Sequence, residues 1–548
     1  MKNIYKKIFL LILNSTFSIY NSFSQTAPAI EWQNTIGGSN ADALYSLQQT
    51  NDGGYILGGL SMSNISGDKT ENCFGTHDYW IVKVDDSGTV QWDKTIGGSD
   101  FDWITSIQQT FDSGYILGGS SESDISGNKT ENNCGTTFNY PDYWIVKTDS
   151  TGNIQWQNNI GGSSVDYLES IRQTAYGGYI FGGSSISQMS CDKTENSNGG
   201  YDYWIIKTDA SGNIQWQNSI GGNQEDLCNS MQLTTDGGYI LGGTSYSNIS
   251  ADKTENCNGD SDYWIVKLDS SGNIQWQNTI GGNKYDELYS LQQVDDGGYI
   301  LGGYSESNIS GDKMENCIGG IGFGDFWIVK TDSVGNTQWQ NTIGGSDLDE
   351  LHSIQQTSDG GYIIGGFSLS NISGDKTENS NGGNDYWIVK LDSSGNIQWQ
   401  NTIGGNSLDQ FSSLQQASDG GYILGGTSYS NISGDKTENN IGNGDFWILK
   451  LFPDTITGIS NLQSSTYNIQ FSPNPLITQS TLTFSNSQKN IFHFTLYDIT
   501  GRVTETVSTV TDKIILTKGS KPAGVYLFNL TNAKTGEGMN GKIVISAL

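Results

Sequence analysis

Carboxylate side chains recur at fixed places along this chain of 548 residues. Near-copies of the segment SNISGDKTEN carry an aspartate and, three residues later, a glutamate, as in Asp68 with Glu71 and Asp375 with Glu378. Oxygen ligands at this density are what a hard cation such as Ca²⁺ requires. These four residues are therefore candidate ligands for calcium, the one cofactor that the sequence suggests.

Two other interpretations of these acidic residues stay open. Their spacing matches no strict calcium-binding loop, and carboxylates repeated in every copy are typical of caps that accept backbone N–H bonds. Paired carboxylates could also hydrolyse glycosides, but the sequence gives no distance between them. The three histidines, His77, His352 and His493, occupy unrelated positions and predict no catalytic triad or zinc cluster.

A single binding site is expected where one copy departs from the others. The second copy has a loop longer by four residues and the fifth a loop longer by three, and both longer loops carry aromatic residues. Exposed aromatic rings on a polar rim suit sugar or protein recognition, and drift in tolerant loops is the alternative. No catalytic residue is assigned, and the candidate binding residues are Phe138, Tyr140, Phe323, Trp103, Arg172 and Tyr285.

The element that must position these residues is a hairpin, DYWIVKLDSSGNIQWQNTIGG at 262–282. Its two arms are rich in aromatic and β-branched residues and flank the turn DSSG. Both alternating faces of each arm carry bulky apolar groups, which predicts strands buried on both faces between neighbouring sheets.

Seven copies of this hairpin predict a seven-bladed β-propeller over residues 31–451. The tryptophan of the QW pair recurs about every 60 residues, and each copy contains four strand-like runs. The last copy lacks its final strand, whereas the array begins with an orphan EWQNTIGG, so we expect the N-terminal strand to complete the last blade. An open β-solenoid is the alternative. The tryptophans are Trp32, Trp92, Trp156, Trp216, Trp276, Trp339 and Trp399.

The glycine pair that ends the second run loosely resembles kelch repeats, and the DxxGNIQW hairpin is similar to the repeats of bacterial secreted propellers. In such a ring, the long polar loops and the connections between blades are expected on one face and the short turns on the other. Variation is therefore expected to gather on the long-loop side.

Charge and export signals narrow the range of partners. The formal net charge of −31 repels nucleic acid phosphates, so no nucleic acid partner is expected. Residues 1–24 have a basic start, an apolar run too short to span a bilayer, and small residues before Gln25, which predicts a secretory signal. No later segment is apolar enough to be transmembrane.

Six cysteines in an exported chain suggest local disulfides. Cys73, Cys257 and Cys317 follow the same loop sequence, and Cys134 lies one residue further along in its own copy. If consecutive copies are neighbours, the expected pairs are Cys73 with Cys134 and Cys257 with Cys317, with Cys191 and Cys228 left over.

The composition changes after the seventh copy. Residues 452–466 are expected to be a linker, and alternating short runs in residues 467–548 predict a small β-sandwich. Four motifs, FSPNP, LYDITGRV, PAGVYLFNL and GKIVI, resemble in order and spacing the type A C-terminal sorting domain of the Bacteroidetes type IX secretion system. The residues that carry this resemblance are Pro473, Asn474, Pro475, Gly501, Arg502, Gly524, Tyr526, Gly541 and Lys542.

The resemblance implies that the outer-membrane translocon of that system is a partner, and that the product is secreted or displayed on the cell surface. The sequence as a whole predicts a binding module for a glycan or a protein. A polysaccharide-degrading enzyme and a structural surface or matrix protein are the alternatives.

Overall fold

The structure is a computed structural model that describes residues 26–135, 140–320, 322–454, 470–472, 476–486, 488–498, 502–519, 521–534 and 538–545. The predicted signal segment, residues 1–24, lies outside this range. The chain divides into two compact units, Met1–Asp454 and Thr455–Leu548. All regular elements of the described residues are β-strands, which confirms the all-β prediction. Over the same ranges, no helix has the length and apolar character needed to cross a bilayer.

Unit 1 is built from four kinds of strand. The first strands are β2 (Asp42–Gln49), β6 (Asp102–Gln109), β10 (Asp166–Gln173), β14 (Asp226–Leu233), β18 (Asp286–Gln293), β22 (Asp349–Gln356) and β26 (Asp409–Gln416). The second strands are β3 (Tyr55–Ser61), β7 (Tyr115–Ser121), β11 (Tyr179–Ser185), β15 (Tyr239–Ser245), β19 (Tyr299–Ser305), β23 (Tyr362–Ser368) and β27 (Tyr422–Ser428). The third strands are β4 (Asp78–Val84), β8 (Asp142–Thr148), β12 (Asp202–Thr208), β16 (Asp262–Leu268), β20 (Asp325–Thr331), β24 (Asp385–Leu391) and β28 (Asp445–Leu451). The fourth strands are β5 (Val90–Ile96), β9 (Ile154–Ile160), β13 (Ile214–Ile220), β17 (Ile274–Ile280), β21 (Thr337–Ile343), β25 (Ile397–Ile403) and β1 (Ile30–Ile36).

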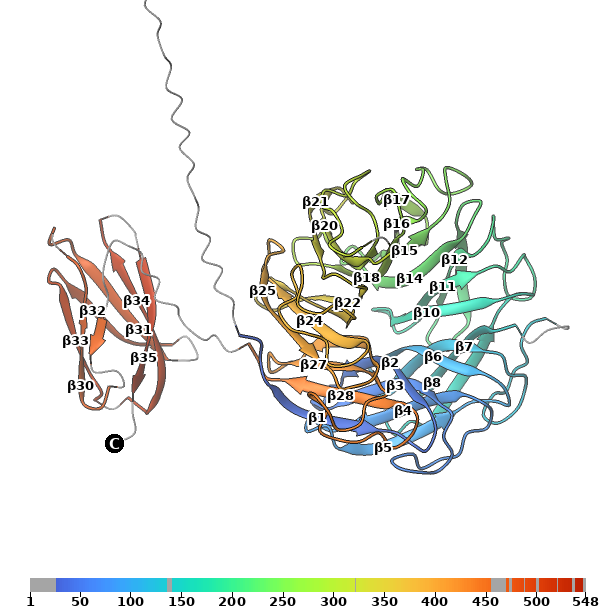
Figure 1. The fold of residues 1–548 in the computed structure, drawn as a ribbon, viewed down its shortest axis with the longest axis horizontal. Coiled ribbons are helices and arrows are strands. Elements are labelled where there is room, and N and C mark those ends of the chain that lie inside the picture. The colour runs from blue at the N-terminus through green and yellow to red at the C-terminus, as the bar shows by residue number, and fades with distance from the viewer. Residues whose placement is uncertain are drawn as a thin grey trace, which may run out of the picture. The chain divides into compact units, whose positions relative to one another are not determined.

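These strands form antiparallel four-stranded sheets, seven of them within the described part of unit 1. Six sheets follow chain order, such as β14-β15-β16-β17, and the seventh has the order β26-β27-β28-β1. Repeated sheets of this kind are typical of propeller blades. Figure 1 shows β6, β10, β14, β18 and β22 nearer the centre of unit 1 than β17, β21 and β25.

Strand β1 makes the contacts of a fourth strand in the last sheet. It pairs antiparallel with β28, so that Gln33 lies opposite Leu449. Gln33 Oε1 accepts the indole N–H of Trp447 at 3.1 Å, and Gln33 Nε2 donates to the carbonyl of Asp435 at 2.8 Å. In the β14 sheet, Gln277 makes the same two bonds with Trp264 and Asp252.

Neighbouring sheets pack face to face. The Tyr263 hydroxyl donates to the carbonyl of Trp327 in the next sheet at 3.0 Å, and the two ring centroids are 4.8 Å apart. The last and first sheets also meet, because Leu44 N donates to Thr427 Oγ1 at 3.1 Å and Ser412 Oγ donates to the Leu44 carbonyl at 2.7 Å.

The predicted hairpin at 262–282 is present as β16 and β17. All residues of β16 are buried, as predicted. The prediction is wrong for β17, in which Ile274 and Gln275 are exposed. The reason is position: β17 is the outer edge of its sheet, so only part of it packs against a neighbour.

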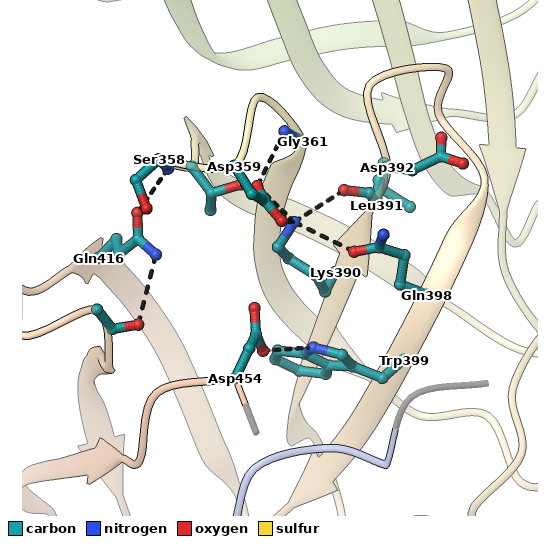
Figure 2. A network of polar contacts seen from close by, with 12 residues as sticks. Ser358, Asp359, Gly361, Lys390, Leu391, Asp392, Gln398, Trp399, Gln416 and Asp454 are labelled. Carbon is teal, nitrogen blue, oxygen red and sulfur yellow. Dashed lines mark hydrogen bonds and ion pairs between the residues drawn. The ribbon is translucent and has the colours of Figure 1, made fainter. Parts of the chain in front are cut away.

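The two ends of the sheets differ. The loops between second and third strands and the connections between repeats meet at one end, the long-loop face, where Asp68 N donates to the Gly37 carbonyl at 2.9 Å. The tight turns lie at the other end, the short-turn face. There Lys390 Nζ contacts the Asp359 carboxylate at 3.0 Å and the Leu391 carbonyl at 3.1 Å (Figure 2).

A buried carboxylate explains the glycine that follows each fourth strand. Asp262 Oδ2 accepts the N–H of Asn258 at 2.5 Å, and a Cβ at Gly281 would collide with the Asp262 carboxylate. Only glycine fits there. Burial raises the pKa of Asp262 to about 7, and the negative charge of Asp286 acts in the same direction. Lys253 Nζ lies 5.0 Å from the centre of the Trp264 ring, and burial lowers the pKa of this lysine.

The cysteine pairing differs from the prediction. The disulfide joins Cys134 to Cys191, with a Cα–Cα distance of 6.4 Å, whereas Cys73, Cys257 and Cys317 are free. In other copies, the residue equivalent to Cys134 packs against a loop glycine of the next copy. In the third copy Cys191 takes the place of that glycine and has a positive φ of 50°. The pair therefore joins non-equivalent positions of consecutive copies, which the spacing of cysteines alone did not indicate.

Unit 2 contains two sheets that share one apolar core. One sheet has β30 (Gln479–Thr483) between β29 (Gln470–Ser472) and β33 (Lys513–Thr517). The other has the order β32-β31-β34-β35, with bounds Val503–Thr509, Phe492–Asp498, Gly524–Asn532 and Gly538–Ile545. Leu482 and Ile514 from the first sheet pack with Phe494, Phe528 and Ile543 from the second, which is a sandwich arrangement.

The buried carboxylates predict that unit 1 is more stable in mild acid. Burial raises the pKa of Asp142, Asp202, Asp262, Asp325 and Asp385 to about 7, whereas an aspartate in an unfolded chain ionises near pH 4. Between these values the folded chain binds more protons than the unfolded one, so the stability falls steadily from about pH 4 to about pH 7 and is greater at pH 5.5 than at pH 7.5. Calorimetry should give a melting temperature higher at pH 5.5 than at pH 7.5 by roughly 5 °C.

Two controls separate this effect from the repulsion due to net charge. The comparison is made in about 0.5 M NaCl, which screens exposed charges, and the variant Asp262→Asn should show a smaller pH difference because an amide does not titrate. An equal or higher melting temperature at pH 7.5 would contradict the prediction.

Candidate functional site

The first strands contain both the most constant and the most variable positions of the repeat. Their pattern is Asp-x-apolar-x-Ser-apolar-Gln-Gln with few exceptions. The fourth residue takes six different identities over seven copies: Tyr45, Thr105, Glu169, Asn229, Tyr289, His352 and Ser412. A binding site for one ligand is expected where equivalent positions differ in this way, because seven identical groups would not select one orientation.

A cavity of about 360 Å³ lies among the seven first strands. Serine and glutamine side chains form most of its wall, and its only ionisable lining residues in the described ranges are Glu169 and Arg172, both from β10. Burial raises the pKa of Glu169 to about 7 and lowers the pKa of Arg172. Arg172 Nη1 donates to the Ile171 carbonyl at 2.7 Å and to Ser106 Oγ at 3.3 Å.

A run of aromatic rings lies on the long-loop face. His77 and Phe101 have ring centroids 4.1 Å apart, Phe101 and Trp103 4.9 Å, Trp103 and Tyr167 5.7 Å, and Tyr167 and Tyr201 5.9 Å. All five side chains are half-buried. We call this set, which spans the β2, β6 and β10 sheets, the aromatic strip.

A second group combines acidic and aromatic side chains from β18 and β22. The Tyr289 hydroxyl donates to Glu287 Oε2 at 2.7 Å and is also hydrogen-bonded to Glu350. Burial, together with these two carboxylates, raises the pKa of Tyr289. His352 stacks on Tyr289 with centroids 5.3 Å apart, and His352 Nε2 lies 3.3 Å from Glu350 Oε1. Two carboxylates thus flank one hydroxyl, an arrangement that could support acid–base chemistry.

The structure separates the six predicted binding residues. Trp103 lies in the aromatic strip and Arg172 in the cavity wall. Tyr140, Phe323 and Tyr285 are exposed, whereas Trp103 makes ring contacts with Phe101 and Tyr167. Phe138 lies outside the described residues.

The four candidate calcium ligands each accept backbone N–H bonds. Asp68 and Asp375 accept from Gly37 and Gly344, each at 3.2 Å. Glu71 and Glu378 accept from Thr95 at 2.8 Å and Thr402 at 2.7 Å. Among the described residues, no group of three or more His, Cys, Asp or Glu side chains could hold a metal ion. Calcium binding here stays a prediction.

Part of the predicted sorting motif can be placed in unit 2. Tyr526 is buried in the core and donates to the Pro522 carbonyl at 3.1 Å, while Arg502 Nε donates to Asp498 Oδ2 at 2.9 Å. Gly524 begins β34, and Gly541 and Lys542 lie in β35, paired with Phe528 and Leu527. Pro473, Asn474, Pro475 and Gly501 lie outside the described residues.

Sequence reasoning missed most of the aromatic strip and the Glu287–Glu350 pair. Tyr167, Glu287 and Glu350 occupy the second position of their first strands, and Tyr289 the fourth. An alignment of the seven eight-residue strands would have shown these positions as the variable ones between constant neighbours.

Comparisons with known proteins give distant likenesses. No family model and no curated protein matches the chain. Among solved structures, it is similar to PorZ, described as an essential bacterial surface component of the type IX secretion system of Porphyromonas gingivalis, with 10% identity and a TM-score of 0.40 over 95% of this chain. The alignment spans 61% of the length of PorZ.

A glycoside hydrolase of family 32 from Bifidobacterium adolescentis gives 9% identity and a TM-score of 0.24, covering 94% of this chain and 95% of the hydrolase. Likenesses this distant do not establish a shared ligand or activity.

Proposed function

We propose that this chain is a surface or secreted glycan-binding protein whose seven sheets are the blades of a closed propeller. The pairing of β1 with β28 and the bonds from Leu44 to the last sheet support closure. In a closed ring the faces of the first and last sheets cover one another, as the faces of all other neighbouring sheets do. The ring also holds side chains from several blades in fixed positions around one mouth, which is what recognition of a ligand requires.

The aromatic strip is the observation that carries the binding function. Its half-buried rings contact one another in succession. The exposed parts of such rings can pack against the C–H faces of sugar rings, and the hydroxyls of Tyr167 and Tyr201 can bind sugar hydroxyls. The strip occupies three of the seven sheets and is therefore not a feature of every repeat, as expected for a single site. The net charge of −31 favours a neutral glycan over a polyanion.

An enzyme acting on such a glycan is the second candidate, supported by the two carboxylates around Tyr289. Retaining glycosidases need two carboxyl groups on either side of the scissile bond. Glu287 and Glu350 come from adjacent first strands and face one another across a hydroxyl, so they are the pair that would perform this chemistry.

Binding to a glycan array followed by calorimetric titration tests the proposal. We expect Trp103→Ala to weaken binding of the best neutral glycan by about fivefold or more, because loss of one stacked ring removes about 1 kcal/mol or more. The matched control is Tyr176→Ala, since Tyr176 is 98% exposed on the short-turn face. Equal affinity of both variants and the parent protein would contradict the assignment.

Incubation of the protein with the glycans that it binds distinguishes an enzyme from a binding module. Conversion of the bound glycan to shorter products by the parent protein, lost in Glu287→Gln and Glu350→Gln, would favour the enzyme. Binding without conversion favours the binding module.

We also propose that unit 2 directs export through the type IX system. The four ordered motifs support this, together with a sandwich core that places Tyr526 inside. Deletion of residues 467–548 in the native host should leave the protein in the periplasm, as measured by cell fractionation. Residues 467–548 fused to an exported reporter should carry it to the cell surface, and normal delivery of the deleted chain would contradict the proposal.

A further inference from the structure

The seventh position of the first strands forms a ring of carboxamides around the cavity. Each side-chain oxygen in this ring accepts the N–H of the last residue of the neighbouring first strand, for example Gln48 Oε1 from Gln109 N at 2.6 Å and Gln108 Oε1 from Gln173 N at 2.7 Å. The same bond recurs at the other four members. The ring consists of Gln48, Gln108, Gln232, Gln292, Gln355 and Gln415.

These bonds fix the orientation of the carboxamides. A backbone N–H must meet an oxygen, so each Nε2 group is left as a free donor. All six side chains line the cavity, and no acceptor for these nitrogen atoms is found among the described residues. The cavity wall therefore presents a ring of N–H donors.

The third copy places Arg172 where the other six copies have glutamine. Its Nη1 donates to Ile171 and Ser106, which leaves most of the five guanidinium donors unused. Within the described ranges, no carboxylate lies within ion-pair distance of Arg172, which is also the only basic residue lining the cavity. Arg172 is half-buried, and a charge that is partly removed from water is costly unless an opposite charge accompanies it.

We propose that the central cavity binds a small oxyanion, either a free inorganic anion such as sulfate or the carboxylate of a sugar acid. Arg172 supplies the charge, and the carboxamides of Gln108 and Gln232, on the two adjacent sheets, supply further donors. The volume of about 360 Å³ suits a small molecule. This site is separate from the aromatic strip and does not depend on its function.

The overall negative charge and the local site act at different ranges. Repulsion from exposed carboxylates is screened within about 10 Å at ordinary ionic strength, whereas Arg172 meets an anion inside the cavity. Polyanions are disfavoured at the surface, but one small anion is stabilised at the guanidinium.

Glu169 makes the binding depend on pH. It is the only other ionisable lining residue in the described chain, and burial raises its pKa to about 7. The titratable groups that face it, Tyr45, Tyr143, Tyr167 and Cys228, stay neutral near pH 7 because burial raises the pKa of each. Protonation of Glu169 therefore removes a negative charge from the cavity, and anion affinity should rise as the pH falls from 8 to 6.

Isothermal titration of the full chain with sodium sulfate and with sodium glucuronate, at constant chloride, tests the site. We expect saturable binding of at least one anion, tighter at pH 6 than at pH 8, and at least tenfold weaker in Arg172→Gln. That variant restores the residue of the six other copies, so it should fold, and an unchanged melting temperature checks this. Arg172→Lys should retain part of the affinity.

Lys207→Gln is the matched control, because Lys207 also belongs to the third copy but does not line the cavity. Preference for sulfate or for glucuronate identifies the source of the oxyanion. Absence of saturable binding of both anions, or equal affinity in the parent protein and Arg172→Gln, would overturn the proposal. Loss of glycan binding in Trp103→Ala has no bearing on this result.

Discussion

The pairing of β1 with β28 is the contact on which the arrangement of unit 1 depends. It joins strands more than 400 residues apart in the chain, and it gives the last sheet the fourth strand that its own repeat lacks. Without β1, the indole of Trp447 would lose its acceptor Gln33, and the fully buried strand β28 would become the outer edge of its sheet. The same sheet forms part of the cavity wall, to which β26 contributes Ser413, Leu414 and Gln415.

Much of this architecture could be predicted from the sequence. The repeated hairpin, the missing last strand and the orphan N-terminal strand predicted the sheet in which the two ends meet. Less could be predicted about burial and disulfides. Ile274 has the character of a buried residue but lies on an outer strand, and the Cys134–Cys191 pair depends on a contact between different positions of consecutive loops.

The candidate sites were harder to predict because they occupy strands that resemble scaffold. Trp103 and Arg172 were identified as departures, but one lies in the aromatic strip and the other in the cavity, so they do not form one site. The partners of Trp103, such as Tyr167, alternate with core residues of the same strand. These rings meet because neighbouring sheets pack side by side, a contact that no single repeat contains.

The central claim is that the two ends of the repeat array close a ring. Thermal unfolding of a chain that begins at Gly37, and so lacks β1, tests it most directly. If the ring is closed by β1, this chain should melt more than about 5 °C below the parent protein, and a peptide of residues 26–36 added in excess should restore part of the loss. A melting temperature equal to that of the parent protein would contradict closure by β1.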